Sequence, residues 1–82
     1  STWFVYILRC ADSTLYTGIS TDVTRRVLSH NAGTGAKYTR SRLPVVCVWQ
    51  EQVSSESIAR KREAALKRLT RAEKQALVLT YK

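Results

Sequence analysis

Residues 3–20 read WFVYILRCADSTLYTGIS, and this stretch sets the start of the fold. Its first part, over 3–10, is rich in aromatic and β-branched residues, which favour β-strands. ADST then supplies turn residues, and LYTGIS over 15–20 is a second strand-like run. The pattern predicts a β-hairpin as the first structural unit of the chain.

A helix and a basic loop are expected after the hairpin. Thr21 or Asp22 can cap a helix of about three turns that ends between Asn31 and Gly33. The segment over 33–42, GTGAKYTRSR, combines glycines with cations and holds no acid. Such a composition predicts a mobile basic loop.

Two further helices are expected near the C-terminus. Ser54 or Ser55 can cap the first of them. Thr70 and Glu73 fit a capping box that starts the second, which is expected to run to about Tyr81. Apolar residues at helical spacing predict the buried side of the first of these helices: Ile58, Ala65, Leu66 and Leu69.

Between the helices, the run VVCVW after Pro44 predicts a third strand. Continuous hydrophobicity favours a strand that is buried on both faces. The expected order is therefore β-β-α-β-α-α, which places the chain in the α+β class as a small three-stranded sheet flanked by helices. Because the chain has only 82 residues, one core and a single domain over 1–82 are expected.

The net charge of the chain indicates which class of partner it binds. Fourteen Lys and Arg residues against six Asp and Glu residues give a net charge of +8. This excess favours a polyanionic partner, with nucleic acid first and an acidic membrane surface second.

Cysteine usage and hydropathy bear on the cellular location. Cys10 and Cys47 stand in separate apolar runs without a CxxC pair, which favours reduced core cysteines over a zinc knuckle or a disulfide scaffold. No apolar stretch approaches the roughly 18 residues that a membrane-spanning helix needs, and no signal-peptide pattern is present. We therefore expect a cytoplasmic protein without a membrane partner, associated with the nucleoid if it is bacterial.

The first helix carries candidate site residues. At about 100° per residue, Arg26 and His30 share the side of Val23 and Val27, whereas Arg25 points the opposite way. A guanidinium on an apolar side must reach a carboxylate, a pocket or water. The structural alternatives are an arginine that extends past the sheet edge and a histidine that only stabilises the end of the helix.

Three tyrosines and a glycine form a second candidate group. Tyr6 and Tyr16 would lie close together if the turn centres on 11–13, and Tyr38 falls in the basic loop. Two phenols in a cationic site can have one pKa lowered, so that a phenolate accepts a proton from water. The alternative is ordinary aromatic pairing in a hairpin. Gly18 within its strand indicates a close backbone approach or a bulge.

Glu63 is the only acid in the cationic stretch over 60–68. A lone carboxylate among cations suits a one-metal phosphodiesterase, in which phosphate and water supply the other ligands. The structural alternative is an ion pair with Lys67 or with Arg60 on the same helix.

Together these residues resemble the GIY-YIG nuclease superfamily over almost the whole chain. The resemblance rests on FVY at 4–6, YTG at 16–18, and the spacing to Arg26, His30 and Glu63. The stretches SHNAGTGAKYTRSRLPVV and ARKREAALKRLTRAEK resemble the small stand-alone bacterial and viral members and the Slx-type structure-specific endonuclease domain. Both tripeptides are incomplete, and an asparagine that many members use late in the domain has no clear counterpart.

The resemblance implies a metal-dependent endonuclease that acts on DNA by structure rather than by sequence, in repair or recombination. It implies that Glu63 holds one Mg²⁺ or Mn²⁺ and that Arg26 neutralises charge on the phosphate. Tyr6 or Tyr16 would be the general base, and His30 with the other tyrosine would position the phosphate or the base.

Nucleic-acid contacts are expected from a larger group of mostly cationic residues: Gly18, Arg25, Lys37, Tyr38, Arg40, Arg42 and Lys67. Branched or flapped DNA is the expected substrate, although RNA would be attracted by the same charge. A second subunit or a second copy of the chain is a further candidate partner. Two alternatives to an enzyme stay open, a non-catalytic nucleic-acid binding module and a subunit whose basic surface binds an acidic protein.

Overall fold

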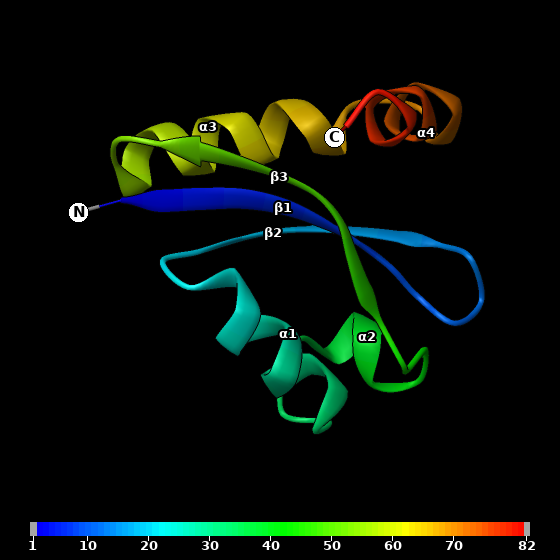
Figure 1. Cartoon of the computed structure of the whole chain (residues 1–82). Coiled ribbons are helices and arrows are strands. Elements are labelled where there is room, and N and C mark those ends of the chain that lie inside the picture. The colour runs from blue at the N-terminus through cyan, green and yellow to red at the C-terminus, as the bar shows by residue number, and fades with distance from the viewer. Residues whose placement is uncertain (1, 82) are drawn as a thin grey trace.

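A computed structural model describes residues 2–81 of the chain. It confirms the predicted order of elements and adds one short helix in the basic segment (Figure 1). The elements are β1 (Trp3–Arg9), β2 (Leu15–Ser20), α1 (Val23–Asn31), α2 (Lys37–Arg40), β3 (Val46–Val53), α3 (Glu56–Lys67) and α4 (Arg71–Leu79). None of the helices within 2–81 is long and apolar enough to cross a bilayer.

The three strands form one antiparallel sheet in the order β2-β1-β3. β1 and β2 make the predicted hairpin, in which Tyr6 pairs with Gly18 and Leu8 pairs with Tyr16. Residues that face each other across two strands share a face of the sheet. The two tyrosines are therefore diagonal neighbours on one face.

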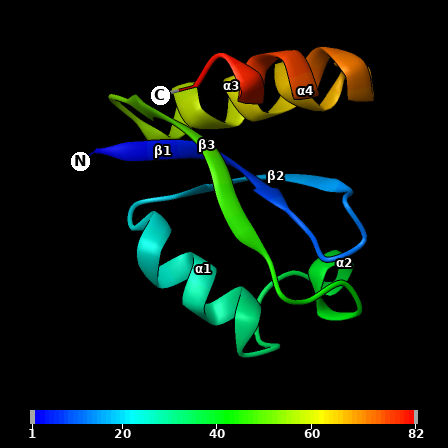
Figure 2. The ribbon, with the colours of Figure 1, turned by 45° about the vertical axis from the view of Figure 1, so that its right-hand side comes forward.

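Helices cover both faces of this sheet (Figures 1 and 2). Val5 and Ile7 of the central strand pack toward α3, in a cluster with Ala59 and Leu66. The alternate residues Tyr6 and Leu8 pack on the opposite face, in a cluster with Val23 of α1. Because side chains alternate along a strand, the fully buried run over 5–8 supplies both cores at once.

Two of the strand and loop predictions are wrong. β3 is an edge strand, and Val46 at its start is 47% exposed, so the strand is not buried on both faces. The central strand of the sheet is β1 instead. The segment over 33–42 is not a featureless mobile loop, because it contains α2 and the fully buried Thr39, and the carbonyl of Arg42 accepts a hydrogen bond from the Ala11 amide.

The buried side of α3 also differs from the prediction. Ala59 and Leu66 are buried, whereas Ile58 is 46% exposed and Ala65 is exposed. The prediction is confirmed for Leu66, which is buried, and for Leu69, which packs against the core. The buried stripe is thus turned around the helix toward Ala59, and Glu63 lies at its border. The helix starts are confirmed: Asp22, Ser55 and Thr70 cap α1, α3 and α4, and Thr70 forms the capping box with Glu73.

Asn31 ties the end of α1 to the segment that leads into β3. Its side-chain amide donates to the carbonyl of Val45 at 3.0 Å, and its Oδ1 accepts from the amide of the same residue at 2.8 Å. Two residues later Gly33 adopts a φ of 81°, which ends the helix in the left-handed region that glycine tolerates. This connection holds the start of the basic segment close to the sheet.

We expect Asn31→Ala to lower the free energy of unfolding by about 1–3 kcal/mol, because both polar groups of Val45 lose their partner. Urea denaturation followed by circular dichroism measures the change. Thr24→Ala, on the exposed side of the same helix, is the control and should stay within about 0.5 kcal/mol of the wild type. Equal stabilities for Asn31→Ala and the wild type would contradict the proposed role of this amide.

Candidate active site

The hairpin places the Tyr6 hydroxyl over the backbone of Gly18. A Cβ atom built on Gly18 would lie 2.5 Å from the hydroxyl oxygen of Tyr6 and 3.2 Å from the ring of Tyr16. Carbon and oxygen atoms cannot approach so closely without displacement, so this position requires glycine. The close approach predicted for Gly18 is confirmed.

His30 lies at the centre of the candidate site and is fully buried. Its Nε2 is 3.2 Å from the hydroxyl of Tyr6, and its Nδ1 is 2.8 Å from the hydroxyl of Thr39 in α2. The imidazole meets the rings of Tyr6 and Tyr16 edge to face, at centroid distances of 6.3 and 5.4 Å. Three elements besides its own helix therefore hold this one side chain.

Tyr38 and Arg42 extend the group outward as a stack. The ring of Tyr38 stacks on Tyr16 at 5.9 Å, and the guanidinium of Arg42 lies 4.0 Å from the Tyr38 ring centroid. Arg42 also pairs with Asp12 at 3.1 Å and donates to the carbonyl of Tyr38 at 2.7 Å. These contacts bind Arg42 to its own chain, whereas Lys37 and Arg40 are exposed.

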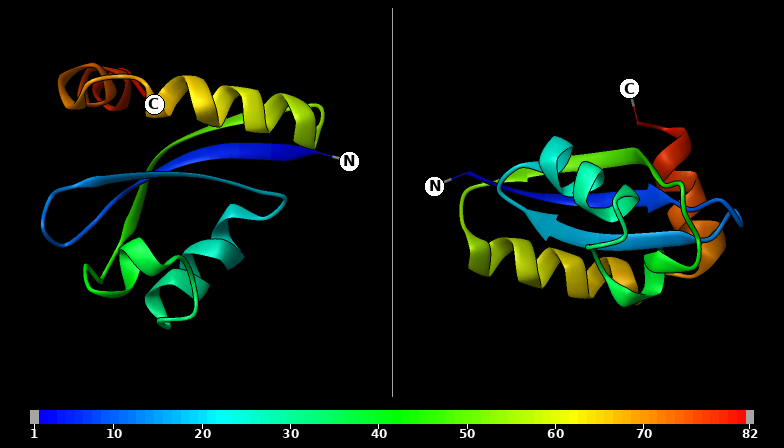
Figure 3. Two further views of the ribbon diagram at one scale, coloured as in Figure 1. Left: turned by 180° about the vertical axis from the view of Figure 1, so that it is seen from behind. Right: turned by 90° about the horizontal axis from the view of Figure 1, so that it is seen from below.

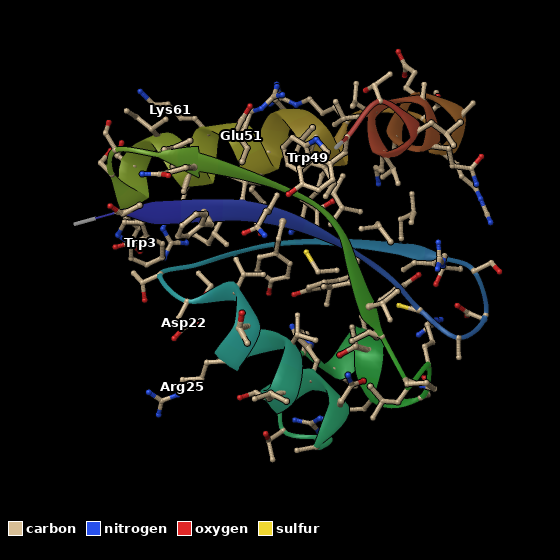
Figure 4. All side chains as sticks on the ribbon, viewed as in Figure 1. Trp3, Asp22, Arg25, Trp49, Glu51 and Lys61 are labelled. Atoms are coloured by element: carbon tan, nitrogen blue, oxygen red, sulfur yellow. The ribbon has the colours of Figure 1, made fainter. Side chains whose placement is uncertain are left out.

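Arg26 acts on the site through its charge. Burial is the main cause that raises the pKa of Tyr6, and Arg26 partly offsets it. Burial also lowers the pKa of His30, and the nearby Arg26 lowers it further. Tyr6 is therefore a neutral phenol and His30 a neutral imidazole at pH 7, so the expected lowering of a phenol pKa is wrong for Tyr6. Arg25, by contrast, extends away from the sheet (Figure 4).

Glu63 belongs to a helix on the opposite face of the sheet, but that helix runs beside the edge strand β2 (Figure 3). Its side chain is 21% exposed, and its negative charge contributes to the raised pKa of Tyr6. The carboxylate is therefore close enough to act on the tyrosine group. Glu63 also pairs with Lys67 at 3.4 Å, as the structural alternative predicts, while Arg60 pairs with Glu56 instead.

The donor set fits a divalent ion held by one carboxylate. Within residues 2–81, no group of three or more His, Cys, Asp or Glu side chains comes together. A half-buried carboxylate beside a cationic surface leaves the remaining positions around such an ion to phosphate oxygens and water. The predicted single ligand, Glu63, is consistent with this arrangement.

Two features escaped the sequence analysis. Thr39 contacts His30 although no pattern distinguishes it from the other polar residues of its segment. A hollow of about 210 Å³ beside Tyr38 is lined by Arg71 and Lys74 of α4, together with Thr14 and Leu15. These two cations extend the positive surface from the site toward the C-terminal helix. The sequence alone did not predict this extension, because it depends on the packing of α4 near the hairpin.

A family model described as the GIY-YIG catalytic domain matches residues 2–76. The chain belongs to the GIY-YIG family. Among relatives, a UPF0213 protein of Natronomonas pharaonis is 56% identical over 75 residues, covering 92% of this chain and 88% of the relative. A UPF0213 protein of Desulfotalea psychrophila is 53% identical over 77 residues, covering 93% and 70%. This GIY-YIG chain is thus similar to a group of small stand-alone proteins.

Solved structures agree with the GIY-YIG assignment. The solution NMR structure of the UPF0213 protein BH0048 of Bacillus halodurans is 44% identical, with a TM-score of 0.61, and covers 95% of this chain and 83% of that one. The NMR structure of the protein EF2693 of E. faecalis is 41% identical, with a TM-score of 0.65 and coverages of 98% and 85%. The α+β fold with its three-stranded antiparallel sheet is therefore shared. GIY-YIG domains are nuclease domains that usually use divalent metal ions, which supports a nuclease acting on nucleic acid.

The pKa of His30 should lie below 6.5 in the folded protein, because burial and Arg26 disfavour the imidazolium. As the chain holds one histidine, NMR titration measures this pKa without assignment ambiguity. Arg26→Gln should raise the pKa toward its ordinary value, whereas Arg25→Gln should leave it unchanged. The unfolded chain binds the proton first, so stability should fall as pH drops from about 6.5 through the folded pKa. A folded pKa above 6.5 would contradict this account.

Nucleic-acid binding should weaken steeply with salt, and each of Lys37→Ala and Arg40→Ala should lower the slope of log K against log salt by up to about one unit. Fluorescence anisotropy with a labelled duplex at several salt concentrations measures the slope. Lys61→Ala is the control, because Lys61 belongs to α3, on the opposite face of the sheet from α1 and α2 (Figure 4). If Lys61→Ala lowered the slope equally, the contribution of a cation to binding would not depend on its position on the surface.

Proposed function

We propose that the chain is a metal-dependent endonuclease that hydrolyses phosphodiester bonds in DNA and selects its substrate by structure. One observation carries the proposal: the buried Tyr6–His30 hydrogen bond lies within electrostatic reach of Arg26, and Tyr6 also lies within reach of Glu63. This group joins a proton acceptor, a guanidinium and a carboxylate. Phosphodiester hydrolysis needs these three functions together.

The proton step follows from the protonation states. Since burial raises the pKa of Tyr6, its hydroxyl keeps its own proton at rest. It can accept a proton from an attacking water only while it passes its own proton to Nε2 of His30, which lies 3.2 Å away. The half-buried Tyr16, which stacks on Tyr38 and meets His30 edge to face, would orient the water or the phosphate.

Arg26 and Glu63 would stabilise the negative charge that develops on the phosphate. The planar guanidinium of Arg26 can form two parallel hydrogen bonds to phosphate oxygens as their negative charge grows. Glu63 would hold one Mg²⁺ or Mn²⁺, which supplies further charge neutralisation at the scissile phosphate. Glu63 would have to exchange its contact with Lys67 for this ion, and a single ion pair whose lysine is exposed is weak enough to be exchanged.

The substrate class is inferred from the surface. The exposed cations are Lys37, Arg40, Arg25 and Lys67, and no base-reading motif accompanies them. Such cations would contact the phosphate backbone rather than the bases. Selection by the shape of branched or flapped DNA, in repair or recombination in the cytoplasm, is consistent with such a surface.

One observation favours a second candidate function. The Glu63–Lys67 ion pair occupies the carboxylate that an ion would need, as expected in a non-catalytic nucleic-acid binding module. The two functions differ in turnover, so a cleavage assay separates them.

Cleavage of branched, single-stranded and duplex DNA with Mg²⁺ or Mn²⁺ tests the proposal. Glu63→Gln should abolish cleavage, while binding stays unchanged or tightens because a negative charge is lost. Glu56→Gln is the matched control, since Glu56 lies in the first turn of the same helix and pairs with Arg60. Full activity of Glu63→Gln would remove Glu63 from the metal-binding role, whereas no cleavage by the wild type with either metal would favour the binding module.

Arg26→Lys keeps the charge but loses the planar pair of donors, so it should lower the single-turnover rate by about 10²-fold or more with little change in Kd. Arg25→Lys, one residue earlier on the same helix, should change neither quantity by much. Parallel losses in rate and affinity for Arg26→Lys would assign this residue to binding alone.

A further inference from the structure

We propose that Thr39 is a positioning residue that fixes the tautomer of His30, with the proton on Nδ1 and a free lone pair on Nε2. The consequence for catalysis rests on the proposed function, but the tautomer itself does not. Thr39 is fully buried and comes from α2, in the segment that sequence patterns marked only as basic.

The assignment follows from the single proton of the Thr39 hydroxyl. That hydroxyl donates to the carbonyl of Ala36 at 2.9 Å, so its proton is already used. Its 2.8 Å contact with Nδ1 of His30 can then be a hydrogen bond only if Nδ1 carries the proton and the threonine oxygen accepts it. The amide of Thr39 donates to the same Ala36 carbonyl, which holds the side chain in this orientation.

The other ring nitrogen is fixed in turn. A neutral imidazole has one N–H, so with Nδ1 protonated Nε2 is an acceptor. The hydroxyl of Tyr6, 3.2 Å away, therefore donates to Nε2. The result is one directed chain of hydrogen bonds from Tyr6 through His30 and Thr39 to the carbonyl of Ala36.

The surrounding segment is built closely around the imidazole. A Cβ atom on Gly35 would lie 2.8 Å from Cγ and 2.9 Å from Cα of His30, so the backbone passes directly against this residue. α2 then lies beside the end of α1 (Figure 2). Besides Thr39, Tyr6 and Tyr16 face the ring from other elements, and the charge that acts on it is that of Arg26 on its own helix. No carboxylate among the described residues hydrogen-bonds the ring, so the threonine is the group that orients it.

This tautomer suits the proton step. As the oxygen of the attacking water bonds to phosphorus, the bond from phosphorus to the leaving oxygen breaks and its electron pair stays on that oxygen. The water proton bonds to the Tyr6 oxygen, and the proton released by the Tyr6 hydroxyl bonds to the Nε2 lone pair. The imidazolium that forms carries a proton on each nitrogen, and its Nδ1–H still donates to Thr39. The acceptor is therefore in place before and after transfer, without reorganisation. The opposite tautomer would direct an N–H at Tyr6 and could not accept the proton of that hydroxyl at Nε2.

Nitrogen-15 NMR of the single histidine tests the assignment without any substrate. The wild type, above the pKa of His30, should show Nδ1 protonated and Nε2 unprotonated. Thr39→Val keeps the shape but removes the acceptor, and should shift the population toward Nε2–H; Thr39→Ser should restore the wild-type spectrum. Thr34→Val, in the same segment, is the control, since the Thr34 hydroxyl donates to Ser29 and not to the ring.

Single-turnover cleavage supplies the second measurement. Thr39→Val should lower the rate by about tenfold or more, with Kd within about twofold of the wild type, and Thr39→Ser should recover most of the rate. A protonated Nε2 in the neutral wild-type protein, or an unchanged tautomer in folded Thr39→Val, would overturn the proposal. If Thr39→Val does not fold, the wild-type spectrum alone decides. If the wild type does not cleave, the proposed function fails, while the NMR result still decides the role of Thr39.

Discussion

Satisfying both nitrogens of a fully buried imidazole is the constraint on which the site depends. An unpaired nitrogen at this depth would cost about 1–3 kcal/mol, so His30 needs a partner on each side of its ring. Tyr6 of the central strand supplies one and Thr39 of α2 supplies the other. The backbone passes close to Tyr6 and to His30, which explains glycine at position 18 beneath the tyrosine and at position 35 beside the imidazole.

The sheet determines which charged side chains lie near Tyr6 and His30. A central strand with alternating side chains serves two cores, so the tyrosine face and the α3 face are separated by one layer of backbone. Glu63 nevertheless acts on Tyr6, because α3 lies along the edge strand β2, which pairs with the strand that carries Tyr6. Arg26 approaches from the other face and acts on both Tyr6 and His30. A neutral, hydrogen-bonded interior is thus flanked by one cation and one carboxylate.

Local patterns were sufficient for much of the fold. Asp22, Ser55 and Thr70 each cap the helix expected after them, because a cap depends on residues only three positions apart. The hairpin follows equally from its own residues. The exposure of Val46 could not be predicted in this way, because strand order is a property of the whole sheet. The buried side of α3 likewise depends on the sheet edge that the helix meets.

For the site, the sequence by itself determined which residue types are present and their spacing, and this pattern indicated Tyr6, Arg26, His30 and Glu63. It also determined the positive charge that favours a polyanionic partner. Only the tertiary structure decided the protonation states and the hydrogen-bond partners of these residues. The raised pKa of Tyr6 comes from burial, and burial depends on helices that are distant in sequence. The contact between Thr39 and His30 was likewise decided by packing, because a threonine hydroxyl has no periodic pattern and acquires its role from the nitrogen placed beside it.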